Sequence, residues 1–229
     1  MKLASQDAVV ALDEDFGKMA VQAGRHAWGL PELTMREKAF VFVAADMCHH
    51  NLQFPLQAHV TMAVSNGVEL AGIREAVRHL APYVGYPTAA ETLMRLAEIE
   101  SSLPDPAAAT GQAVAGARAA APGPAEPPVL DTTGVRGLDG AFADFLAQQF
   151  EERWGRSGLS PRERALCTIA TDVMNGTLDE SFRLHVGLAL ASGAGEQQVR
   201  AVLLLLAEFG VAKSWRAYRA LAGMAAARS

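Results

Sequence analysis

The sequence has only two cysteines among its 229 residues, Cys48 and Cys167, and they lie far apart. Neither has a partner at Cys-x-x-Cys spacing, so the chain carries no disulfide framework and a reducing compartment is expected. Cys48 follows a run of apolar residues. It is therefore predicted to be a packing residue rather than a peroxidatic thiol.

Long hydrophobic runs are also missing. The longest apolar stretch, residues 199–207, is interrupted by Arg200, so no segment is expected to span a bilayer. The first sixteen residues, MKLASQDAVVALDEDF, place acids after each short apolar run, which is unlike a signal or transit peptide. These features predict a cytoplasmic protein that does not act on membranes.

The chain lacks an excess of positive charge and the common cofactor motifs. Its formal net charge is −5, with acids interleaved among the lysines and arginines, which excludes a typical nucleic-acid backbone binder. It contains no glycine-rich phosphate loop and no G-x-S-x-G nucleophile motif, so no cofactor is expected. No segment alternates apolar and polar residues with β-branched side chains, and the predicted fold class is therefore all-α.

The sequence contains an internal repeat. Residues 33–81 align without a gap on residues 159–207 when the numbering is shifted by 126. Each copy reads Leu-(Thr/Ser)-x-Arg-Glu-(Lys/Arg)-Ala, an apolar helix, Leu-x6-His-Val, a glycine and a second apolar helix. The repeat predicts two tandem helical modules that share one plan.

The limits of the modules follow from composition and helical periodicity. We expect a first module over residues 1–101, an Ala/Pro/Gly-rich linker over 102–130, and a second module over 131–229. The linker composition cannot bury enough apolar surface to order itself. Helices are predicted over residues 7–27, 35–48, 55–65, 69–84 and 88–101, and over residues 140–154, 161–175, 178–192, 196–212 and 213–227.

A glutamate and a histidine recur at a fixed spacing of 22 residues, as Glu37 and His59 and as Glu163 and His185. A helix pair could bring them together for proton transfer, because histidine titrates near neutrality and a carboxylate can fix its tautomer. A competing interpretation exists for each residue. The histidines could be buried core residues, and the glutamates stand three residues after Thr34 and Ser160, which is the spacing of a capping box.

The first copy also contains four residues of metal-ligand type. They are Asp46, His49, His50 and His59. The second copy retains only the equivalents of the first and last, so a metal site could exist in the first module alone. The alternative, which we prefer, is that His49 and His50 form a polar helix end, and no metal site is predicted.

Three segments resemble the carboxymuconolactone decarboxylase family, within the superfamily that includes alkylhydroperoxidase D. They are residues 154–166 (WGRSGLSPRERAL), the Leu-x6-His-Val segment at 178–186, and the Tyr-x-Gly-x-Pro segment at 83–87. The resemblance covers nearly all of the chain outside the linker, as two fused copies. It implies a small all-helical unit that assembles as trimers or hexamers, and for this fused chain a homotrimer.

The resemblance also implies a reaction, namely loss of CO2 from a small cyclic lactone carboxylic acid, followed by protonation of the resulting dienolate. His59 would be the general acid and Glu37 its orienting residue, with His185 and Glu163 as the counterparts in the second copy. The candidate substrate-binding residues are Tyr83, Tyr86, His50 and Arg36.

Two departures from the family pattern limit what is carried over. The peroxidase branch needs Cys-x-x-Cys ahead of the histidine, but these positions hold Leu52 and Pro55 in the first copy. The second copy lacks the Tyr-x-Gly-x-Pro segment, which favours the first module as the active one. The alternatives are an acid–base isomerase or dehydratase, or a catalytically silent protein that binds a ligand or serves assembly.

Overall fold

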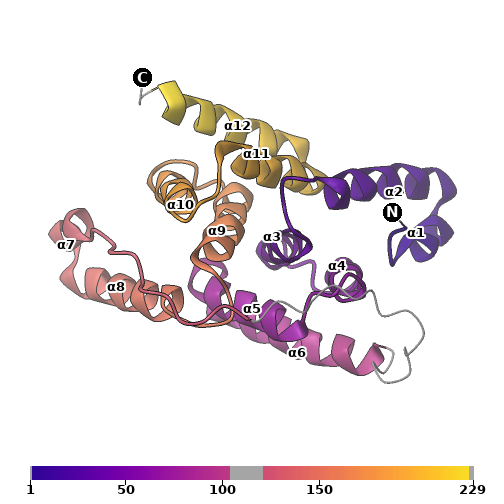
Figure 1. Ribbon diagram of the computed structural model, residues 1–229, viewed down its shortest axis with the longest axis horizontal. Coiled ribbons are helices and arrows are strands. Elements are labelled where there is room, and N and C mark those ends of the chain that lie inside the picture. Colours follow the sequence, from indigo (N-terminus) through magenta and orange to yellow (C-terminus); the bar gives the residue numbers. More distant parts are fainter. Residues whose placement is uncertain (1, 104–120, 227–229) are drawn as a thin grey trace.

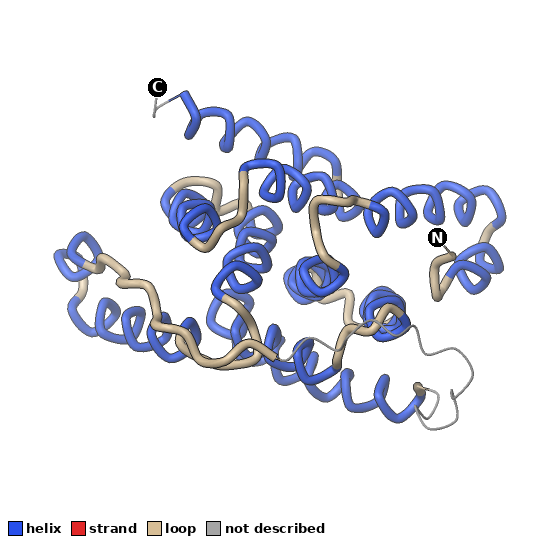
Figure 2. Tube along the Cα trace, in the orientation of Figure 1, coloured by secondary structure: helices blue, strands red, loops and turns tan. Residues whose placement is uncertain are grey.

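A computed structural model describes residues 2–103 and 121–226, and every regular element within them is helical (Figure 2). The predicted all-α class is confirmed. The first copy comprises α1 (Gln6–Leu12), α2 (Glu14–Gly29), α3 (Met35–Cys48), α4 (Phe54–Ser65), α5 (Leu70–Val84) and α6 (Tyr86–Ser102). The second comprises α7 (Thr133–Leu138), α8 (Gly140–Trp154), α9 (Pro161–Asn175), α10 (Glu180–Ala191), α11 (Glu196–Leu205), a 3₁₀ turn (Leu206–Phe209) and α12 (Val211–Ala226).

The predicted linker is described only in part, because residues 104–120 lie outside the described residues. Residues 121–132 run without helical structure, and the carbonyl of Pro122 accepts a hydrogen bond of 2.7 Å from the Gly158 N–H. In the described ranges, no helix is both long and apolar enough to cross a membrane.

Two predicted helix boundaries are wrong. The helix expected over residues 7–27 is divided between α1 and α2 at Asp13, which has an extended backbone and whose side chain caps α2 by accepting from the Phe16 N–H at 2.7 Å. The break expected between residues 212 and 213 occurs at Gly210, where φ is +140°. Only glycine adopts that backbone angle without strain, and Gly210 therefore ends the turn that precedes α12.

Helices α3 and α9 begin with the same local signal. The Thr34 hydroxyl accepts from the Glu37 N–H, and the Glu37 carboxylate accepts from the Thr34 N–H at 2.8 Å. Ser160 and Glu163 repeat both bonds at the start of α9. These reciprocal bonds satisfy donors that a helix N-terminus otherwise leaves free, so the capping interpretation of both glutamates is confirmed.

The central helices α3 and α9 pack against each other, and most of their side chains are buried (Figure 1). The core around them is continuous and draws on both copies, including the fully buried side chains of Phe40, Leu80, Leu166 and Leu205. Because neither central helix has a face left for solvent, each copy covers apolar surface that the other would otherwise expose.

Two reciprocal ion pairs join the N-terminal ends of α3 and α9. Arg36 Nε donates to Glu163 at 2.7 Å, and Arg162 Nε donates to Glu37 at 2.6 Å. The carboxylates are thus the capping residues of their own helices and the ion-pair partners of the opposite copy. The arginine and glutamate of the repeated Arg-Glu dipeptide therefore form a contact between the two copies.

We expect Arg36→Ala to lower the free energy of unfolding by about 2 kcal/mol, because it removes charge-assisted bonds from the nearly buried Glu163 carboxylate. The control is Arg136→Ala, which removes the exposed Arg136–Asp144 pair and should cost about 0.5 kcal/mol. Urea unfolding of both variants measures the difference. Equal losses would show that the ion pair between the copies contributes no more than a surface pair.

Candidate functional site

A histidine–aspartate pair lies between α3 and α4. Asp46, fully buried in the last turns of α3, contacts His59 on α4 with 2.7 Å between Oδ2 and Nδ1. An ionised carboxylate only accepts, so Nδ1 is the donor in this bond and the other ring nitrogen, Nε2, is left for a ligand. The His59 side chain remains 13% exposed.

The predicted pairing of Glu37 with His59 is not present. Glu37 is bound to Thr34 and Arg162 at the start of α3, whereas Asp46 lies nine residues further on, about 13 Å along the helix axis. The same holds in the second copy, where Asp172 rather than Glu163 contacts His185 at 2.7 Å. The signal for the aspartate in the sequence is that Asp46 and Asp172 are identical residues of the repeat.

Aromatic rings surround His59. Phe42 stacks on the imidazole with 4.3 Å between ring centroids, and Trp28 stacks on Phe42 at 4.7 Å. Phe209, from the 3₁₀ turn of the second copy, lies 5.9 Å from His59. The site therefore combines side chains from both copies.

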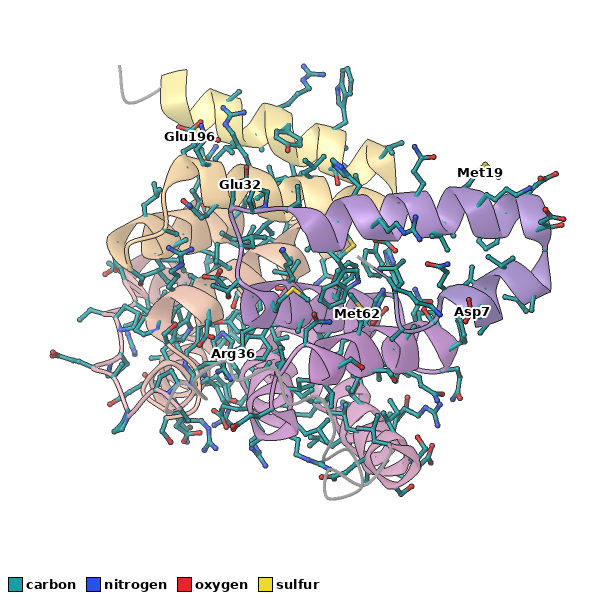
Figure 3. All side chains as sticks on the ribbon, turned by 45° about the vertical axis from the view of Figure 1, so that its right-hand side comes forward. Asp7, Met19, Glu32, Arg36, Met62 and Glu196 are labelled. Atoms are coloured by element: carbon teal, nitrogen blue, oxygen red, sulfur yellow. The ribbon has the colours of Figure 1, made fainter. Side chains whose placement is uncertain are left out.

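A cavity of about 440 Å³ opens beside His59. Helices α1 and α2 cover one side of it and α4 forms another, with Met62 on the side of α4 that faces the first two helices (Figure 3). Its lining is mainly apolar. The polar side chains among the lining residues are Ser5, Gln6, His49, Asn51, His59 and Glu208.

Glu208 was not predicted as a site residue. It belongs to the 3₁₀ turn of the second copy and lines the cavity of the first copy's histidine. The signal in the sequence is the segment EFGVAK at residues 208–213, which stands where the first copy has Tyr-x-Gly-x-Pro. Sequence alone does not show that this segment crosses to the other copy's site.

The environment shifts the pKa of His59 upward. Burial by itself lowers this pKa, but the charge and hydrogen bond of Asp46, with a further contribution from Glu208, outweigh burial and raise it above its ordinary value. The imidazolium form is therefore favoured in the folded protein. His59 contributes stability that is fully present below about pH 6.5 and is lost as pH rises through the raised pKa.

The four predicted substrate-binding residues lie outside the His59 cavity. Tyr83 packs its ring 5.4 Å from His185 in the second copy, and Tyr86 is exposed and hydrogen-bonded to Gln149 and Arg153 of α8. Arg36 is bound to Glu163, as described above. His50 is an exposed turn residue with φ of +53°, at the position where the second copy has Gly176 in the same left-handed region.

The second copy builds a related but closed site. Asp172 accepts from Ser181 at 2.5 Å and from Thr177 at 3.1 Å in addition to its contact with His185. The indole of Trp154 lies parallel to the His185 ring at 6.2 Å and donates to the Tyr83 hydroxyl at 2.9 Å. His185 Nε2 is buried and has no partner among the described residues. The His185 imidazole is therefore closed to a ligand, whereas the His59 imidazole lines an open cavity.

The candidate metal ligands of the first copy have other partners. His49 Nε2 lies 2.9 Å from Lys213 Nζ, and because the ammonium only donates, this nitrogen is unprotonated. Among the described residues, no group of three or more His, Cys, Asp or Glu side chains is arranged to hold a metal ion.

Burial raises the pKa of the Cys48 thiol to about 12, which fits the packing role predicted for it.

Replacing Asp46 by asparagine should lower the pKa of His59 below its ordinary value of about 6.5, because burial remains while the carboxylate charge is removed. An NMR titration of the histidine ring signals measures this. Asp172→Asn, the matching change in the second copy, should leave the His59 titration unchanged. A His59 pKa that stays raised in Asp46→Asn would contradict the role given to Asp46.

Comparison with known proteins agrees with the fold and the repeat. The model of the carboxymuconolactone decarboxylase family matches residues 14–98 and again residues 140–223. A crystal structure from Burkholderia xenovorans, described as a "putative gamma-carboxymuconolactone decarboxylase subunit", aligns over 99% of this chain and 92% of its own, with a TM-score of 0.54 and 18% sequence identity. At that identity the similarity shows the fold alone.

No curated protein sequence matches the chain. The family model, however, covers well over half of it, in two segments that coincide with the two copies. The chain therefore belongs to the carboxymuconolactone decarboxylase family, with two family units fused in one polypeptide.

Proposed function

We propose that the protein is an enzyme that moves a proton to or from a small, largely apolar molecule through His59. The observation that carries this proposal is the His59–Asp46 pair at the wall of a 440 Å³ cavity. Cavities of this size suit small-molecule ligands. A ring nitrogen that is held by a carboxylate on one side and open to a ligand on the other is arranged for acid–base catalysis.

Each residue has a distinct role in this proposal. Asp46 is a positioning residue that fixes the His59 tautomer and stabilises the imidazolium. His59 Nε2 is the catalytic donor or acceptor. The surrounding rings of Trp28, Phe42 and Phe209 exclude water, which strengthens the electrostatic interactions of the site.

The first reaction we propose is decarboxylation of a small cyclic lactone carboxylic acid, as the family's name suggests. Loss of CO2 would leave negative charge on the lactone as a dienolate, and the His59 imidazolium would deliver a proton to carbon. The raised His59 pKa supports this role, since it lets the donor stay charged to a higher pH than an ordinary histidine.

A second candidate is a proton shift without loss of CO2, as in an isomerase or dehydratase. The composition of the cavity favours it. No lysine or arginine is among the described residues that line the cavity, and Glu208 adds a negative charge. A substrate carboxylate would find no ion-pair partner of the kind that usually binds it.

The His185 site is proposed to be catalytically silent. Its imidazole is sealed by Trp154 and Tyr83, and its aspartate is saturated by hydroxyl donors. Such a site would serve stability. The active site would then be the one in the first copy, completed by the second.

Incubation with γ-carboxymuconolactone tests the decarboxylase proposal. We expect ultraviolet absorbance to report enol-lactone formation and a CO2 assay to report its release, both falling by at least about 10²-fold in His59→Ala. His185→Ala is the matched control and should keep turnover once folding is verified by circular dichroism. Full turnover in His59→Ala would refute the assignment, whereas product without CO2 would favour the second candidate.

We also propose that the protein assembles as a homotrimer. The two helical hairpins, α1–α2 and α7–α8, lie at opposite ends of the molecule (Figure 1). They expose apolar side chains at positions 126 residues apart, the same shift that relates the two copies, and such exposed side chains suit contacts between chains. These pairs are Leu12 and Leu138, Phe16 and Phe142, and Met19 and Phe145.

Light scattering is expected to give three times the chain mass of 24.2 kDa. Met19→Glu and Phe145→Glu together should lower this mass, because each places a charge in the proposed contact. Met94→Glu, at another exposed methionine, should not. A monomeric parent protein would contradict the proposal.

A further inference from the structure

Glu208 stands at the His59 cavity although it belongs to the other copy. The Glu208 carboxylate lies near α2. A Cβ built on Gly24 of that helix would lie 4.0 Å from Glu208 Oε1. The residue is exposed, and the following Phe209 packs beside His59. The position therefore places an accessible carboxylate in the same cavity as the open ring nitrogen of His59.

The remaining polar groups near this carboxylate are already occupied or neutral. Lys213 donates to His49 Nε2 at 2.9 Å and to the Met174 carbonyl at 2.7 Å, and it is not among the lining residues. Burial and the nearby Lys213 lower the pKa of His49, so this ring stays neutral. Asp46 and His59 form a pair of opposite charges. Glu208 is the one carboxylate among the described lining residues.

We propose that Glu208 is a second catalytic residue and that, with His59, it enolises neutral, largely apolar carbonyl compounds. This inference rests on the proposed proton-transfer role of His59 and deepens it by naming a base and a substrate class. A carbonyl oxygen would accept from His59 Nε2, and the adjacent C–H would meet the Glu208 carboxylate. The apolar lining would hold the rest of the molecule.

The step balances within these three groups. The C–H bond next to the carbonyl breaks, its proton passes to Glu208, and its electron pair forms a carbon–carbon double bond. The carbonyl π electrons form an O–H bond with the proton from His59 Nε2, which gives the enol. The reverse transfers restore the ketone, the carboxylate and the imidazolium, so no oxidant or other reactant is needed.

Charge defines the substrate class. A carboxylate on the ligand would be repelled by the Glu208 carboxylate in a cavity of low polarity. No cation among the described lining residues would compensate for this repulsion. A neutral carbonyl compound meets no such repulsion. The other copy cannot do this chemistry at His185, because the position equivalent to Glu208 is Pro82.

Deuterium exchange tests the proposal with cyclohexanone as the probe. The full-length protein in D2O near neutral pD should replace the protons next to the carbonyl faster than buffer alone, as followed by loss of their NMR signal. Glu208→Gln and His59→Gln should each reduce the protein-dependent rate by about 10²-fold. Glu91→Gln, an exposed acid on α6 outside the cavity, should exchange at the parental rate.

A negatively charged probe of the same ring structure tests the substrate class. The ketone 4-oxocyclohexanecarboxylate should exchange at least about tenfold more slowly than cyclohexanone with the parent protein. Glu208→Gln is surface-exposed and should melt at the parental temperature, which circular dichroism verifies. Glu208→Asp retains the carboxylate and should keep more exchange than Glu208→Gln.

The outcomes separate this inference from the proposed function. Exchange that requires His59 but survives in Glu208→Gln would overturn the role of Glu208 and leave proton transfer by His59 standing. No protein-dependent exchange of cyclohexanone would overturn the inference, whereas the lactone assay would still decide the proposed function. Equal exchange of both ketones would overturn the substrate class.

Discussion

The packing of α3 against α9 is the contact on which the rest of the structure depends. Both helices are buried on nearly all sides, so neither copy can fold around its own central helix without exposing apolar surface. The two Arg–Glu pairs at their N-terminal ends fix the relative positions of the helices. Helices α4, α5, α10 and α11 pack against this central pair.

Because of this packing, each copy contributes an aromatic side chain to the other copy's site. Tyr83 lies beside His185, and its equivalent Phe209 lies beside His59, because the end of α5 and the 3₁₀ turn after α11 each reach the opposite copy. The two sites have consequently diverged through residues of both halves. Ser181, Thr177, Trp154 and Tyr83 close the second site, whereas Glu208 and the α1–α2 hairpin shape an open cavity at the first.

Histidine chemistry in this fold is set by burial as well as by partners. His59 and His185 have the same 2.7 Å contact with an aspartate, yet His59 lines the 440 Å³ cavity whereas His185 is buried. A hydrogen-bonded imidazole is therefore insufficient as a sign of activity. What distinguishes the two is whether the second ring nitrogen can reach a ligand, since proton transfer requires contact within hydrogen-bond distance.

The sequence by itself determined the all-α class, the repeat, the capping boxes and the two histidines, because periodicity and capping are local signals that neighbouring residues carry. Only the tertiary structure decided that Asp46 rather than Glu37 meets His59, that Arg36 joins the copies, and that Glu208 enters the first copy's cavity. These contacts join residues on different helices, several of them more than a hundred positions apart, and depend on how α3 packs against α9. The number of residues between two positions in the chain does not give the distance between their side chains in the folded protein.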